Sequence, residues 1–136
     1  MHGIVLLNGM RDKRVPPALR QFVDREYEHY LGGTHGTVTI ARLVLEQSMA
    51  PGIAFVLADE LEPTGYYARL NDTSIMFVAY PGAVVRIDRS EPASAEVARA
   101  VGRLFLVEAS HMRFEEMFEL DHPEMHPDTD AERDAG

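Results

Sequence analysis

YYARLNDTSIMFVAYPGAVVRID, residues 66–88, carries the strongest strand signal in the chain. Runs rich in Ile, Val, Phe and Tyr alternate here with turn residues, and one more apolar run precedes the segment. The four runs lie at residues 53–58, 66–71, 74–80 and 83–88, and the turn residues between them lie at 62–65, 71–73 and 81–82. Because connections this short cannot join parallel strands by a crossover, the pattern predicts a four-stranded antiparallel β-meander.

A helix is predicted upstream of the meander. Pro16 and Pro17 suit the first turn of a helix, and apolar residues then recur at spacings of three and four until Gly32. These apolar residues are Leu19, Phe22, Val23, Tyr27, Tyr30 and Leu31. Gly32 is the expected end of this helix, because glycine favours the conformation in which helices stop.

Two further elements flank this helix. Residues 3–7 form a short apolar run that predicts a strand ending at the turn-favouring pair Asn8-Gly9. Thr37 can cap a second helix that ends before Pro51-Gly52. A strand is the alternative for this second segment, since residues 37–40 are mostly β-branched.

A long helix is predicted after the meander. Ser90 or Ser94 can cap it, and it runs through Met112 and as far as Leu120. Its expected core-facing side chains are Val97, Val101, Leu104 and Phe105. The predicted fold class is α+β: a single domain in which a four-stranded antiparallel β-meander packs with N-terminal helices and a long C-terminal helix.

Composition narrows the function classes. The 136 residues suit one domain, which is expected over residues 1–121. The formal net charge of −9 argues against direct binding to nucleic acid or to an anionic membrane, and favours a protein partner with a basic surface. Most of that charge lies in residues 115–136, which carry nine acidic residues and only one basic residue, Arg133. We expect residues 122–136 to be an acidic, disordered tail. A homo-oligomer is compatible with this composition.

Several chemistries and locations are excluded or disfavoured by what the sequence lacks. The chain has no cysteine, so it forms no disulfide, thiol nucleophile or Cys-ligated metal site. No serine lies in a Gly-x-Ser-x-Gly elbow. The apolar run near the start is shorter than the core of a signal peptide, and no run is long enough to span a membrane, so a cytoplasmic location is expected.

Histidines and carboxylates near the C-terminus are the best candidates for chemistry. On the predicted long helix, His111 and Glu115 are four residues apart and share one face, and Glu119 extends the series. His122 and His126 supply two more imidazoles. Imidazole and carboxylate are suitable ligands for a divalent transition metal, so His111, Glu115, His122 and His126 are a candidate metal site. The alternative is an exposed His–Glu helix pair followed by a frayed end.

Two other regions are weaker candidates. Tyr66, Tyr67, Asn71, Phe77 and Tyr80 lie on the predicted meander, where an outward-facing set of aromatic side chains can form a protein-recognition surface. The alternative is that a second helix covers that face. The three glycines of residues 32–36 can expose backbone N–H groups to an anion if a helix starts after them. A plain connection between two helices is the alternative there.

Residues 65–112 contain a series of motifs in this order: Gly65-Tyr66-Tyr67, Asn71, Met76-Phe77 with Pro81, Val84-Val85, and a helix that opens at Ser94-Ala95-Glu96-Val97 and contains Arg103-Leu104-Phe105. In these motifs the chain resembles the ArdB/KlcA antirestriction proteins. The chain departs from the family at Tyr67, where the family has tryptophan, and at its Asn71-Asp72-Thr73-Ser74 turn. The resemblance implies a small mobile-element protein, from a plasmid or phage, that counters host type I restriction without evident enzymatic chemistry.

Two functions are therefore predicted from the sequence. The first is a non-catalytic protein-interaction module, such as a mobile-element inhibitor of a host nucleic-acid-processing defence complex, which needs no cofactor. The alternative is a small metal-binding protein or metal-dependent enzyme that holds a divalent transition metal through the His and Glu residues near the C-terminus.

Overall fold

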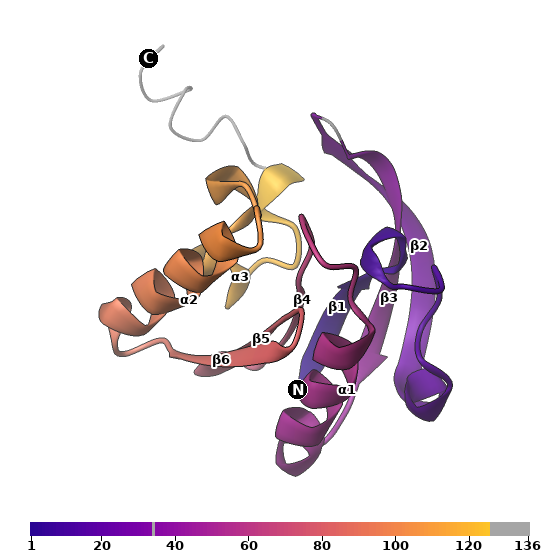
Figure 1. Cartoon of the computed structure of the whole chain (residues 1–136). Coiled ribbons are helices and arrows are strands. Elements are labelled where there is room, and N and C mark those ends of the chain that lie inside the picture. Colours follow the sequence, from indigo (N-terminus) through magenta and orange to yellow (C-terminus); the bar gives the residue numbers. More distant parts are fainter. Residues whose placement is uncertain (34, 126–136) are drawn as a thin grey trace.

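The structure is a computed structural model that describes residues 1–33 and 35–125 as a six-stranded antiparallel sheet with helices (Figure 1). The strand order is β2-β3-β1-β4-β5-β6. The strands are β1 His2–Leu6, β2 Val23–Gly32, β3 Gly36–Val44, β4 Ala68–Asn71, β5 Ile75–Tyr80 and β6 Ala83–Asp88. The α-helices are α1 Ala50–Glu60, α2 Pro92–Leu104 and α3 Phe114–Met117. Short 3-10 helices are η1 Leu7–Gly9, η2 Pro17–Phe22, η3 Gln47–Met49, η4 Ala109–His111 and η5 Pro123–Met125.

The α+β class and the absence of cysteine agree with the sequence analysis, but the predicted four-stranded meander with a long C-terminal helix is wrong. The strands β4, β5 and β6 do form a meander. The run at 53–58, however, lies within α1. Pro51 occupies the first turn of that helix, so the Pro51-Gly52 pair marks a helix start where we expected a break. Periodicity could not separate strand from helix in a run that is apolar throughout.

The helix predicted to start at Pro16-Pro17 and to stop at Gly32 is also wrong, because this segment forms η2 and then β2. Along β2 the exposed residues alternate with partly buried ones: Tyr27 and His29 are shielded, whereas Glu28 and Tyr30 are exposed. Apolar residues that are four positions apart lie on one face of a strand, whose period is two residues, and also on one face of a helix, whose period is 3.6 residues. Pairing with β3 along its length decides in favour of the strand.

The strand alternative is correct for the next segment, which forms β3 and not a helix. Both faces of β3 are buried. Val38 and Ile40 are buried on one face, and Ala41 and Leu43 are buried on the other. Gly32 pairs with Gly36 where β2 and β3 form a β-hairpin, and a strand, not a helix, starts at Gly36, so no helix N-terminus is available there to hold an anion.

The predicted long C-terminal helix ends early, at Leu104. The N–H groups of Leu106 and Val107 donate to the carbonyls of Arg103 and Gly102, at 3.1 and 3.0 Å, and Leu106 has φ of +60°. These bonds form the Schellman motif that terminates helices, in which glycine usually occupies the position of Leu106. With leucine there, the sequence gives no stop signal.

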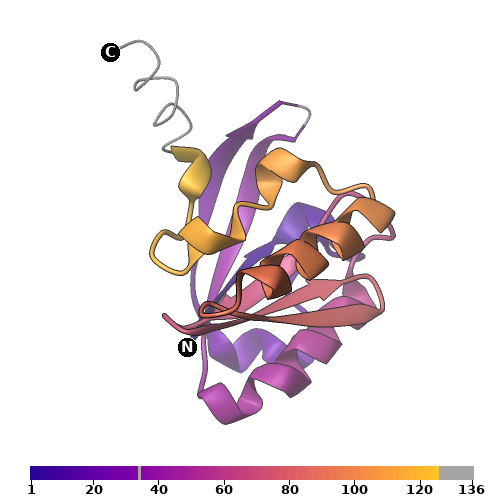
Figure 2. The ribbon, with the colours of Figure 1, turned by 90° about the vertical axis from the view of Figure 1, so that its left-hand side faces the viewer.

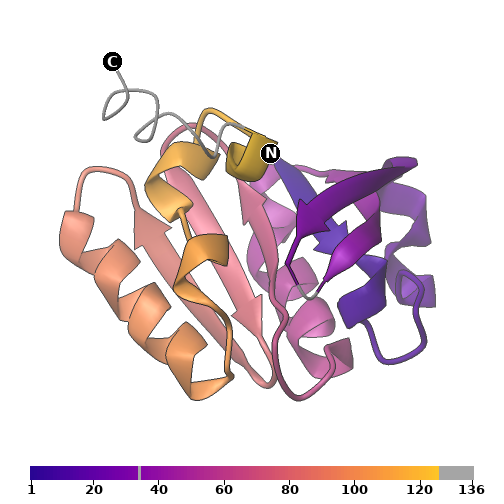
Figure 3. The same cartoon turned by 90° about the horizontal axis from the view of Figure 1, so that it is seen from above.

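The helices cover the two faces of the sheet unequally. Helix α1 packs on one face against β4, β5 and β6, and α2 packs on the other, against β5 and β6 (Figure 2). We call these the α1 face and the α2 face. Residues 105–125, here called the C-terminal segment, lie over the α2 face beside α2, with their last part near the β2–β3 hairpin (Figure 3).

Helix α2 contacts the sheet through small residues rather than the predicted apolar side chains. Ala95, Ala98 and Gly102 are buried, whereas Val97 is 56% and Leu104 is 79% exposed. The predicted core-facing side chains are therefore partly wrong. In residues 1–33 and 35–125, none of the helices has the length and hydropathy that crossing a membrane requires.

Candidate metal centre and adjoining cavity

The candidate centre starts from two neighbouring positions on one side of β2. Tyr27 and His29 are two residues apart, so their side chains lie on the same face of the sheet. Their partners on β3 are Ile40 and Val38, which are buried on the α2 face. The hairpin thus places a phenol and an imidazole on the half of that face that α2 does not cover.

The C-terminal segment brings His122 and Glu124 onto these residues. Glu124 Oε1 lies 2.6 Å from His29 Nε2 and 3.2 Å from His122 Nδ1. The two imidazole rings stack, with their centroids 4.0 Å apart. One ligand atom from each of the three residues lies within 4.8 Å of the other two. The side chains are 9% (His29), 13% (His122) and 22% (Glu124) exposed.

Tyr27 fixes the orientation of His122. Its hydroxyl is 2.5 Å from His122 Nε2. Without a metal, His122 Nδ1–H donates to the Glu124 carboxylate, so Nε2 accepts a hydrogen bond from the Tyr27 hydroxyl. A metal bound at Nδ1 would take the place of that proton, and Nε2–H would then donate to the Tyr27 oxygen. Metal-bound histidines are commonly held in this way, by a partner on the ring nitrogen that does not bind the metal.

Glu124 is ionised in this setting. Burial by itself raises the pKa of Glu124, but hydrogen bonds from His122, from the backbone and from His29 outweigh it and lower the pKa to about 2. Two imidazoles and one carboxylate are the ligand set of many catalytic zinc sites and of non-haem iron sites, in which the remaining coordination positions take water or substrate. The three residues can therefore hold a divalent transition metal.

A second polar cluster lies beside the centre on β4. The buried Arg69 donates to Asn71 Oδ1 at 2.8 Å and to the Asp121 carbonyl oxygen. The carboxylate of Asp121 binds His2 Nε2 at 2.7 Å. The hydrogen bond from His2 is the main reason that the pKa of Asp121 falls to about 2. These contacts attach the C-terminal segment to the two central strands.

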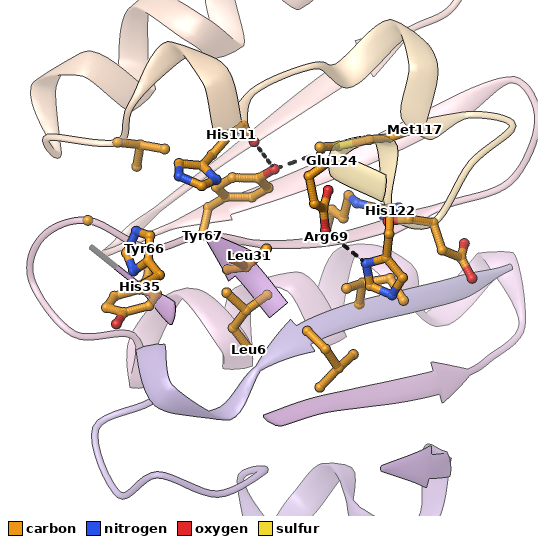
Figure 4. Close-up of a pocket in the computed structure, with 15 residues that line it drawn as sticks. Leu6, Leu31, His35, Tyr66, Tyr67, Arg69, His111, Met117, His122 and Glu124 are labelled. Carbon is orange, nitrogen blue, oxygen red and sulfur yellow. Dashed lines mark hydrogen bonds and ion pairs between the residues drawn. The ribbon is translucent and has the colours of Figure 1, made fainter. Parts of the chain in front are cut away.

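The two clusters border one cavity of about 50 Å³, drawn in Figure 4. His122 and Glu124 lie at one end, His35 and His111 lie at the other, and Tyr67 and Arg69 lie between them. Burial, and then the neighbouring His111, lower the pKa of His35, which disfavours its charged form. Apolar side chains complete the lining: Ile4, Leu6, Leu31, Ile40, Val107 and Met117.

The predicted metal ligands do not come together as a set. Of the four, His122 is in the centre, and His111 lies at the far end of the cavity, with its ring against His35. Glu115 binds Arg99 through both of its oxygens, at 2.7 and 2.8 Å. Because η4 and α3 are separate short helices, His111 and Glu115 share no helical face. His126 lies outside the described residues, as do the other tail residues 127–136.

The predicted recognition residues do not form an exposed surface. Asn71 and Tyr80 are fully buried, and Tyr80 donates to the Ala98 carbonyl at 2.7 Å beneath α2. Phe77 packs into the core on the α1 face. Tyr66 and Tyr67 line the cavity and are partly buried. The alternative weighed for this face, that a helix covers it, therefore holds for β5 and β6.

Sequence reasoning missed His29, Glu124 and Arg69. The helix predicted from sequence contains His29, although Arg25, Tyr27 and His29 alternate with acidic residues, a strand pattern that places the three side chains on one face. No local signal pointed to Arg69, because its importance comes from the segment that folds over it.

Comparison of the chain with protein-family models, with curated proteins and with solved structures found no match. The resemblance of residues 65–112 to the ArdB/KlcA antirestriction proteins therefore stays a prediction.

Proposed function

We propose that this protein binds a divalent transition-metal ion through His29, His122 and Glu124. The observation that carries the proposal is the convergence of three ligand atoms within 4.8 Å, from residues that are distant in sequence. Two further features support it. Tyr27 holds the non-ligating nitrogen of His122, and a cavity adjoins the centre. With three protein ligands, a bound metal keeps positions for water or a small substrate, as in metal-dependent hydrolases and oxygenases.

Metal binding is tested on purified protein that has been stripped with a chelator. Equilibrium dialysis against zinc, nickel and manganese, followed by elemental analysis, measures how many ions bind and how tightly. We expect one ion per chain in the wild-type protein, and a loss of affinity of about 100-fold or more in His29→Ala and in His122→Ala, since each removes a ligand.

The matched control is His111→Ala, which removes a histidine from the same cavity but from its other end. It is expected to keep the wild-type affinity. Absence of any bound ion, or equal binding by wild type and His29→Ala, contradicts the proposal. A loss of affinity in His111→Ala alone favours the ligand set predicted from sequence.

A second function, a non-catalytic interaction module that inhibits a defence complex, has one specific observation in its favour. Val97, Leu104 and Leu106 are 56%, 79% and 70% exposed, along α2 and just after it. Large apolar side chains gathered on a surface are typical of protein interfaces. The partner that we propose has a basic surface, because Glu96 and Glu108 lie near these residues in sequence.

This second function is tested in a host that carries type I restriction, by the plating efficiency of unmodified phage. Expression of the wild-type protein is expected to raise the efficiency, and Leu104→Asp is expected to abolish that effect. Phe55→Asp is the matched control, because Phe55 is 64% exposed on α1, on the other side of the sheet. Equal plating with and without the protein contradicts this function.

A further inference from the structure

Arg69 is a buried cation without a carboxylate partner. Its residue exposure is 3%, and its hydrogen bonds go to two neutral oxygens, Asn71 Oδ1 and the Asp121 carbonyl. Within residues 1–33 and 35–125, no carboxylate oxygen lies within ion-pair distance of its guanidinium. Buried arginines are usually paired with an anion, because an isolated buried charge is unfavourable.

The nearest carboxylates are directed elsewhere. Asp121 binds His2 at 2.7 Å and lies 4.0 Å from Arg42, and Glu124 binds His29. Burial lowers the pKa of Arg69, although the nearby carboxylates of Asp121 and Glu124 oppose this effect. Burying this guanidinium costs desolvation energy. Among the described residues, no carboxylate lies close enough to offset that cost by an ion pair.

The Arg69 guanidinium has N–H donors that these hydrogen bonds do not use, and it borders a cavity. A guanidinium carries five N–H donors, and the two hydrogen bonds above use two of them. Arg69 also lines the cavity that holds His122 and Glu124. Its volume of about 50 Å³ accommodates about three to five water molecules, which suits a small ion or the head of a small molecule and is too little for a nucleotide.

The bonds from Arg69 to Asn71 and Asp121 also fix its orientation. Asn71 is itself held, because its Nδ2 donates to the carbonyls of Asp72 and Met117, at 3.0 and 3.3 Å. A fixed guanidinium loses little conformational freedom when it binds an anion, and its planar shape matches the two oxygens of a carboxylate or a phosphoryl group.

We propose that Arg69 binds the oxyanion group of a small substrate, a carboxylate or a phosphoryl group, inside this cavity and next to the metal held by His29, His122 and Glu124. The inference rests on the proposed metal-binding function and adds the substrate class: a small anionic molecule whose charged group binds Arg69 while a neighbouring atom reaches the metal. Neutral molecules of the same size lack the charge that this position selects.

The test uses the full-length protein labelled with ¹⁵N, first metal-free and then loaded with zinc. Acetate, inorganic phosphate and neutral acetamide are titrated in turn, while NMR follows the arginine side-chain signals and the β4 amides. We expect acetate or phosphate to shift the Arg69 signals in both forms, and acetamide to leave them unchanged. The anion that binds more tightly identifies the carboxylate or the phosphoryl group as the ligand.

Variants distinguish anion binding at Arg69 from nonspecific attraction of anions to positive charge on the protein. We expect Arg69→Gln to weaken anion binding by about 10- to 100-fold, and Arg69→Lys to weaken it less, because hydrogen bonds to a charged partner are lost or reduced. Arg42→Gln is the matched control: it removes a cation from the same face that does not itself line the cavity and whose guanidinium contacts only the carboxylate of Asp121 among the lining residues, and it is expected to keep the wild-type affinity.

Failure of this inference is distinct from failure of the metal site. If zinc binds by dialysis but neither anion shifts the Arg69 signals, the inference is overturned and the metal site stands. If no metal binds, the metal proposal fails, and the titration of the metal-free protein alone decides on Arg69. If Arg69→Gln does not fold, the wild-type titration against acetamide still gives the answer.

Discussion

Leu106 and Gly102 show how single residues shape the end of α2. Leucine at φ of +60° is in the left-handed region, where its Cβ is crowded against the backbone at a cost of about 1–2 kcal/mol. Burial of the leucine side chain offsets little of this strain energy, because Leu106 is 70% exposed. The strained residue therefore makes the chain leave the helix without contributing to the core.

We predict that Leu106→Gly stabilises the protein. Glycine relieves the left-handed strain but adds flexibility to the unfolded chain, so the net gain in the free energy of unfolding is about 0.5–1 kcal/mol. Urea denaturation followed by circular dichroism measures it. Leu104→Gly, within the last turn of the helix, is the control and is expected to destabilise. A Leu106→Gly protein no more stable than wild type argues against the strain.

At Gly102 we predict that a small substitution destabilises the protein, in contrast to Leu106→Gly. A Cβ at this position would lie 2.3 Å from Met112 Sδ and 2.8 Å from the Tyr80 hydroxyl oxygen. Gly102→Ala is therefore expected to lower the free energy of unfolding by about 1–3 kcal/mol, despite the better helix propensity of alanine. Gly52→Ala in α1, where a Cβ meets nothing within 4 Å, is the control and is expected to be neutral or stabilising.

The elements themselves were predictable to different degrees. The turn residues around 71–73 and 81–82 located β4, β5 and β6, because turn chemistry is local. The segments 19–31 and 53–58 were exchanged between helix and strand for different reasons. In the first, apolar residues at spacings of four fit both periods, and the second is apolar throughout. Only the partner of a strand decides such cases, and the partner is not visible in a local pattern.

Docking of the C-terminal segment on α2 is predicted to depend on pH. The Arg99 guanidinium hydrogen-bonds the Glu115 carboxylate and lowers the pKa of Glu115 below its ordinary value of 4.5. The stabilisation from this pair is therefore fully present above that ordinary value, and it is lost as the pH falls through the lowered folded-state pKa.

Glu115→Gln is the variant that tests this dependence. We expect it to destabilise the protein by about 0.5–1 kcal/mol at pH 7, a modest amount because Glu115 is half exposed, and by much less at pH 3. Thermal unfolding of both proteins across that range measures the difference. Glu119→Gln, which removes a more exposed pair with Arg89, is expected to have a smaller effect. A Glu115→Gln effect that does not change with pH contradicts the assignment.

On the scale of the whole molecule, the candidate centre joins parts that are distant in the chain. His29 and Glu124 are separated by 95 positions, as are Tyr27 and His122. His122 could be selected from the sequence because histidine near carboxylates is a general metal signal. His29 and Glu124 could not be selected in this way, because they become neighbours of His122 only where the C-terminal segment crosses the sheet. The same crossing buries Arg69 and creates the cavity.

Metal binding is accordingly predicted to stabilise the whole fold. An ion that binds only the folded chain raises the free energy of unfolding by about 2.7 kcal/mol at a concentration 100 times its Kd. Scanning calorimetry with zinc and with a chelator is expected to show a higher Tm with zinc for wild type and for His111→Ala, and no rise for His29→Ala. A rise of equal size in all three proteins indicates zinc binding elsewhere.

The central position of β1 has a consequence for how this protein is made. This strand pairs with β3 on one side and with β4 on the other, and His2 binds Asp121, which lies 119 positions later. During synthesis, β1 leaves the ribosome before β3 and β4 and stays unpaired until they follow. Because pairing between strands that are distant in the chain closes long loops, we expect folding of this sheet to be slow, and β1 completes its two ladders only after β4 has been made.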